Sequence, residues 1–165
     1  MMIIRPFWLA TLVAVGAFAA SPKASAQSAL GAPLFAVLVG GNECTTAVPP
    51  VCRFGVGDPD AIGSATILLV PFNAISTRVC FGLTVNNLAG ATVAEIHRGV
   101  AGTNGPVVVL LAPPVAPFNA DPGASSGCVA VPASTAGAIR ADPTSFYVHV
   151  HNIAFPSGAA RGQLH

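Results

Sequence analysis

The sequence contains few charged residues. Asp, Glu, Lys and Arg together make up 8% of the 165 residues, and the single lysine, Lys23, lies close to the N-terminus. Without Lys23 and Arg5, five arginines face six carboxylates, which gives a net charge of about −1. Nucleic-acid binding and electrostatic docking on a membrane both need a basic surface. We therefore expect neither kind of partner.

Long apolar runs are also scarce, and the one long run lies at the N-terminus. A positively charged start, residues 1–5, precedes the mostly apolar residues 6–20, and an Ala-x-Ala-like site follows, ending at Ala26. This pattern is typical of a secretory signal peptide. A membrane anchor is the alternative, but the run is shorter than the roughly 20 residues that cross a bilayer. The sequence predicts a signal peptide over 1–26, one domain over 27–165, a secreted or periplasmic location and no membrane span after cleavage.

The chain has only four cysteines, Cys44, Cys52, Cys80 and Cys128. Export favours disulfide bonds, and four cysteines allow three pairings. A short Pro-rich loop separates Cys44 from Cys52, which favours a local bridge there and would leave Cys80 to pair with Cys128. A cysteine metal site would need reduced thiols at closer spacing.

Several short segments with alternating or apolar character are separated by Gly, Pro and Asn. In residues 77–85, for example, Val79, Phe81, Leu83 and Val85 fall on one face, as the period of two in a strand requires. Residues 107–111 are apolar throughout, which indicates a central strand, and Asn104-Gly105 before them is a hairpin-turn signal. Residues 134–141 could form a short helix with Ser134 as its N-cap. The remaining strands are expected at 34–39, 63–70, 92–97, 127–131, 146–151 and 160–164. About eight short strands with at most one short helix predict an all-β, antiparallel sandwich or barrel.

Three stretches carry a family resemblance: LVGGNEC…VPPV…GDPDAIGSATILL at 38–69, EIHRGVAGTNGPVVVLL at 95–111 and DPTSFYVHVHNIAFPSGAARGQL at 142–164. The chain resembles the CHRD domain, found in tandem in the extracellular antagonist chordin and singly in secreted microbial proteins. The resemblance implies an immunoglobulin-like β-sandwich or barrel outside the cell, but growth-factor binding by chordin does not transfer to a lone domain. The residues of these motifs that we single out are Glu43, Arg98, Asn104, Gly105, Tyr147, Arg161 and Gly162.

The chain departs from the family pattern at two positions. Many members carry His-x-His before the Arg-Gly pair, where this chain has Glu95 and His97. Many also carry Asn where this chain has His149. A polar site at these positions would therefore have a changed composition here.

Alternation also predicts a candidate site. Glu95 and His97 share one strand face, and His149 and His151 share another. If the two strands are neighbours, three imidazoles and a carboxylate converge, a set suited to zinc or copper. The alternative is that the histidines are neutral, hydrogen-bonded side chains on a half-exposed face.

Arg161 is expected to have a structural partner. Glu43 or Glu95 could accept a bidentate pair from its guanidinium, and Gly162 leaves room for close strand approach. No serine lies in a nucleophile-elbow context, and oxidised cysteines supply no thiolate, so we expect no catalysis.

Two hypotheses of function follow. The first is a disulfide-stabilised, non-catalytic module that binds an extracytoplasmic protein or envelope component and needs no cofactor. The second is a zinc- or copper-binding, or redox-active, protein that uses the histidine cluster.

Overall fold

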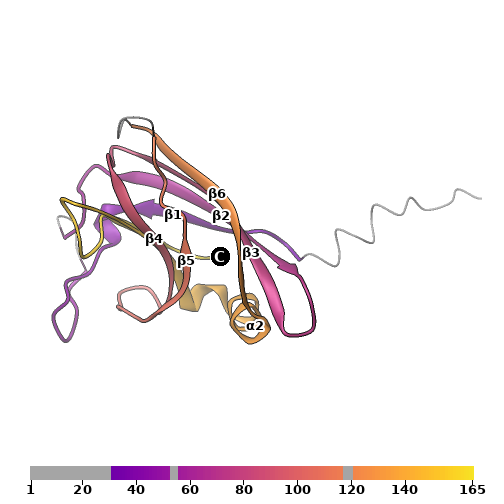
Figure 1. Ribbon diagram of the computed structural model, residues 1–165. Helices are drawn as coiled ribbons and strands as arrows, with labels where there is room; N and C mark the ends of the chain where they lie inside the picture. Colours follow the sequence, from indigo (N-terminus) through magenta and orange to yellow (C-terminus); the bar gives the residue numbers. More distant parts are fainter. Residues whose placement is uncertain (1–30, 53–55, 117–120) are drawn as a thin grey trace, which may run out of the picture.

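The computed structural model describes residues 31–52, 56–116 and 121–165. The predicted signal peptide lies outside these residues. Eight strands form one antiparallel sheet in the order β5-β4-β7-β8-β1-β2-β3-β6, and the sheet curls into a nearly closed barrel (Figure 1). The all-β prediction is confirmed, in its barrel form. The strands are β1 (Leu34–Val39), β2 (Ile62–Pro71), β3 (Ser76–Asn86), β4 (Ala91–Arg98), β5 (Val107–Leu111), β6 (Gly123–Pro132), β7 (Phe146–Asn152) and β8 (Ala160–Gln163).

Alternation along each strand divides its side chains between the barrel core and the outside. In β3, Val79, Phe81, Leu83 and Val85 are all buried in one apolar cluster, as predicted. The same cluster includes alternate residues of the other strands, because antiparallel pairing in register keeps like faces together. Burial of this apolar surface is the main stabilising contribution to the fold.

The two edges of the sheet, β5 and β6, approach each other. Val115, just after β5, forms an isolated antiparallel bridge with Ala124 in β6. One α-helix in the described part of the chain, α2 (Ala133–Ala141), packs beside β3 and β6 at one end of the barrel and buries Ala136 and Ile139 (Figure 1). The described ranges also include two short 3-10 helices, η1 (Gly40–Asn42) and η3 (Pro143–Ser145).

Three local predictions were wrong. Segment Val107–Leu111 is an edge strand rather than a central one, and Leu110 is 63% exposed. Apolar character alone does not give a strand's place in the sheet. In the loop before it, the residue with positive φ is Gly102 (81°), so Asn104-Gly105 is not the turn. The helix starts at Ala133, whose N–H donates to Ile75 O (2.9 Å), and Ser134 makes no capping hydrogen bond.

The favoured disulfide pairing is confirmed. Cys44 pairs with Cys52 after η1, and Cys80 pairs with Cys128 across the β3–β6 ladder, where the two residues are in register. The second bridge spans 48 residues, and closing a loop of that size contributes on the order of 4 kcal/mol in the chain-entropy model. No helix in the described ranges is long and apolar enough to cross a membrane.

Candidate metal centre

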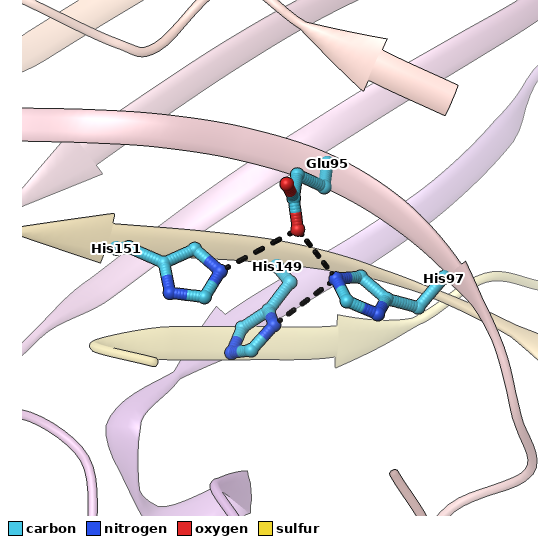
Figure 2. A group of neighbouring side chains, drawn as sticks. All are labelled: Glu95, His97, His149 and His151. Carbon is cyan, nitrogen blue, oxygen red and sulfur yellow. Dashed lines mark hydrogen bonds and ion pairs between the residues drawn. The ribbon is translucent and has the colours of Figure 1, made fainter. Parts of the chain in front are cut away.

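Strands β4 and β7 are antiparallel neighbours, which brings the predicted site residues together. Glu95 lies opposite His149 in the register, and His151 lies opposite Val93. Because alternate residues of both strands enter the core, Glu95, His97, His149 and His151 share the opposite face. Figure 2 shows the three imidazoles gathered around the Glu95 carboxylate, and one potential ligand atom from each residue lies within 4.8 Å of all the others. The predicted convergence is confirmed.

Three short distances define the centre of this cluster. His97 Nε2 lies 2.7 Å from Glu95 Oε2 and 3.4 Å from His149 Nδ1. His151 Nε2 lies 3.7 Å from the same Glu95 oxygen. Three ring nitrogens and one carboxylate oxygen thus face a common point (Figure 2).

The other nitrogen of each imidazole faces an acceptor outside the cluster. His97 Nδ1 lies 2.8 Å from Gly105 O, and His151 Nδ1 lies 3.1 Å from Pro156 O. A carbonyl only accepts, so each Nδ1 carries the proton and donates it. His149 Nε2 lies 3.0 Å from Glu43 Oε2 and donates to that carboxylate in its ionised form. In these neutral tautomers, each ring directs a lone pair at the cluster centre.

Such outer hydrogen bonds are the usual way to fix the orientation and tautomer of metal-binding histidines. These tautomers also place two electron-rich atoms against each other at the centre of the cluster. With His97 Nδ1 protonated, the Nε2 lone pair would face a carboxylate oxygen at 2.7 Å, and only a proton or a metal cation between them relieves the repulsion.

His151 has an inward-facing nitrogen without a partner. Its Nε2 is buried and has no hydrogen-bond partner in the described part of the chain. Buried polar atoms are nearly always paired, and an unpaired one calls for an explanation. The alternative prediction was that the histidines are neutral, hydrogen-bonded side chains. It accounts for the outer nitrogens but does not explain the unpaired Nε2 atom of His151.

Burial shapes the electrostatics of the cluster. His97 and His149 are only 9% and 5% exposed, and Glu43 is 1% exposed. Burial lowers the pKa of His149 to about 3, and the neighbouring His97 and Arg161 act in the same direction. Burial also lowers the pKa of His151 and raises that of Glu43 to about 7. Neutral imidazoles are the form that binds metal.

The turn after β7 covers His149 closely. Gly158 has φ of 137°, and a Cβ atom there would overlap both His149 Nε2 and the Glu43 carboxyl group. Only glycine fits this position without strain. Tyr147 packs against the second buried histidine, His97, and the two stacked rings have a centroid distance of 4.9 Å.

The predicted pairing of Arg161 with Glu43 or Glu95 was wrong. Among the described residues its guanidinium forms no salt bridge. It donates to carbonyl and amide oxygens, namely Asn42 O (2.7 Å), Thr103 O (3.1 Å) and Asn104 Oδ1 (3.0 Å). The two glutamates are turned toward histidines instead. Gly162 behaves as predicted, since a Cβ there would overlap Val37 O of β1.

The other motif residues divide between the site and its surroundings. Gly105 accepts from His97, Tyr147 stacks on that ring, and Arg98 is exposed on β4 outside the cluster. No sequence pattern predicts that Glu43 and Gly158 lie against His149. Glu43 is 106 residues from His149, and no periodic pattern links positions that far apart.

The fold and the site define an all-β barrel with two disulfides and a partly covered histidine–carboxylate cluster on its outer face. The family model of the CHRD domain matches residues 34–164, and the chain therefore belongs to the CHRD domain family. No curated protein and no solved structure matches the chain.

Proposed function

We propose that this CHRD domain is a non-catalytic, extracytoplasmic binding domain whose ligand is a divalent transition-metal ion. Glu95, His97, His149 and His151 would hold the ion. The observation that carries the proposal is the shared orientation of the three imidazoles, each with one nitrogen held by an outside acceptor and the other directed at the centre. Histidine nitrogens with one carboxylate oxygen suit zinc and copper, and by the general affinity order copper(II) binds more tightly.

An extracytoplasmic location has independent support. Both disulfides need an oxidising compartment to form and persist, and the N-terminal sequence has the pattern of an export signal. In such a compartment the cysteines are oxidised and do not compete for the metal. Binding of a partner protein or envelope component stays a prediction, because no feature of the described residues identifies that partner.

The direct test is metal content. Protein exported with its disulfides intact is dialysed, reconstituted with zinc or copper(II) in separate samples and measured by mass spectrometry. We expect near-stoichiometric metal in the parent, and none in a variant with His97, His149 and His151 all replaced by Ala.

Two single variants sharpen this test. His151→Ala removes the most exposed of the three histidine ligands, whose side chain is 14% exposed. This variant should therefore fold normally and still lose the metal. His165→Ala is the matched control, because this exposed histidine lies outside the cluster. Metal-free parent protein after reconstitution, or metal retained by the triple variant, would refute the proposal.

A further inference from the structure

Arg161 is a buried cation without a carboxylate partner. The residue is 4% exposed, and all six carboxylates of the chain lie in the described ranges, yet none is within ion-pair distance of its guanidinium. The guanidinium donates to neutral oxygens, and its Cζ atom lies over the Tyr147 ring, 4.8 Å from the ring centroid. Burial raises the pKa of Glu43 to about 7 and the positive charge of Arg161 acts in the opposite direction, so these two groups interact beyond ion-pair distance. A buried charge is costly unless an opposite charge in contact with it compensates it, so this position would stabilise a further anion formed against the guanidinium.

The Cys44–Cys52 disulfide lies directly against that cation. Arg161 NH2 contacts Cys44 Sγ and lies 3.6 Å from Cys52 Sγ. Cys44 is only 3% exposed, whereas Cys52 is half-buried. If the bridge were reduced, a thiolate on Cys44 would place a negative charge in direct contact with the guanidinium, which has no carboxylate at ion-pair distance.

A cavity gives access to the outer sulfur. Its volume is about 260 Å³, and Asn42, Cys52, Gly102, Arg161 and Gln163 are among its lining residues. Cys44 does not line it. A small thiol entering the cavity would therefore reach Cys52 and not Cys44.

We propose that Cys44–Cys52 is a redox-active disulfide that exchanges with external dithiols. A thiolate of the dithiol attacks Cys52 Sγ, the S–S bond breaks, and Cys44 leaves as a thiolate stabilised by Arg161. The second thiol of the dithiol, as its thiolate, then attacks its own sulfur in the mixed disulfide. Cys52 is released and takes up a proton, and the dithiol becomes a disulfide, so two electrons pass to the protein. A better-stabilised leaving thiolate favours this direction of exchange.

The second disulfide provides an internal control. Cys80–Cys128 bridges β3 and β6, and the nearest arginine along the strand, Arg78, is exposed with its guanidinium over the Phe72 ring at 4.1 Å. Loop length also differs, with separations of 8 and 48 residues, and a shorter loop by itself gives a less stabilising bridge. The proposal therefore requires that the two bridges differ in how easily they are reduced, but such a difference alone does not show that Arg161 causes it. Arg161 must be varied as well.

The experiment equilibrates the exported protein, kept metal-free with a chelator, in buffers of reduced and oxidised dithiothreitol. Thiols are trapped by alkylation, and each bridge is quantified by peptide mass spectrometry. We expect Cys44–Cys52 to be reduced under conditions that leave Cys80–Cys128 oxidised. Arg161→Gln should make the first bridge at least tenfold harder to reduce, which corresponds to about 30 mV, and should leave the second unchanged. Arg161→Lys, which keeps the charge, should restore part of the effect.

A second variant keeps the proposal testable if Arg161→Gln does not fold. Cys52→Ser leaves Cys44 as a single thiol in a chain that keeps Arg161. Its thiolate, followed by ultraviolet absorbance because Cys44 is too buried for a reagent to report on it directly, should be half-formed at least one pH unit lower in the folded protein than in the same protein unfolded in urea. The proposal is overturned if folded and unfolded protein titrate alike, or if Cys44–Cys52 is no easier to reduce than Cys80–Cys128. Neither outcome depends on whether the histidine cluster binds metal.

Discussion

The outer faces of two strand pairs, β2–β3 and β4–β7, differ in how they meet solvent. Both pairs bury alternate apolar residues in the barrel core. The outer face of β2–β3 carries Ser64, Thr66 and Thr84, all exposed. The outer face of β4–β7 carries His97 and His149, both buried, although they too point away from the core.

Covering segments account for the difference. Residues from the end of η1, from the loop before β5 and from the turn after β7 reach the β4–β7 face and supply acceptors to its histidines. On β2–β3 the hydroxyl groups of Ser64 and Thr84 bond to each other at 2.9 Å and remain exposed. A polar face becomes a site when loops exclude water from it and fix its side chains, because buried polar groups must then find partners in the protein.

The largest expected difference between the two faces is at two glycines, Gly158 and Gly82. Gly158→Ala places a methyl group against His149 and Glu43 at a positive φ, whereas Gly82→Ala on β3 meets nothing within 4 Å. We expect the first substitution to cost about 3 kcal/mol of unfolding free energy and the second about 0.5 kcal/mol or less. Urea unfolding monitored by circular dichroism measures both free energies of unfolding. Equal losses in the two variants would contradict the conclusion that the covering segments close over the β4–β7 face.

The next test removes one side chain from each face. His149→Ala leaves Glu43 Oε2 without its partner, while Glu43 Oε1 is already unpaired in the described part of the chain. We expect a loss of about 2 kcal/mol from this buried, unsatisfied carboxyl group. Thr84→Ala is the matched change on the open face. Similar losses in the two variants would show that the β4–β7 face is not effectively buried.

Glu43 itself tests the outer hydrogen bonds of the site. Glu43→Gln keeps the shape and places an amide beside His149 Nε2, but it removes the carboxylate that holds the ring. We expect zinc or copper affinity to fall about tenfold or more, as is usual for such partners of metal-binding histidines. Isothermal titration calorimetry would measure this, with unfolding free energy as the check on folding. Unchanged affinity would mean that Glu43 does not position His149.

The smallest effect is expected on the open face. Replacing both Ser64 and Thr84 by Ala breaks one exposed hydroxyl–hydroxyl hydrogen bond. Surface changes of this kind usually stay within about 0.5 kcal/mol, and metal content should not change. A larger loss in urea unfolding would show that this face also contributes to the fold.

Sequence patterns could predict what depends on the period of a strand. They placed eight strands and the four converging side chains, because alternation fixes which residues share a face once β4 and β7 are neighbours. The disulfide pairing was predicted separately, from the short loop between Cys44 and Cys52. They could not place β5 at the edge, since an apolar strand can lie anywhere in a sheet order. They also could not show that Glu43 faces His149, because that contact depends on how the segment after β1 folds over the barrel.

The Cys80–Cys128 bridge has a topological consequence for the cluster. The bridge closes a covalent ring of chain that contains all of β4 and β5, while β7 lies outside the ring. A protease cut in the loop between β4 and β5 would leave two pieces joined through this disulfide until it is reduced. Glu95 and His97 would then belong to one piece and His149 and His151 to the other. An ion held by all four would act as a second, reversible link between the two halves of a nicked chain.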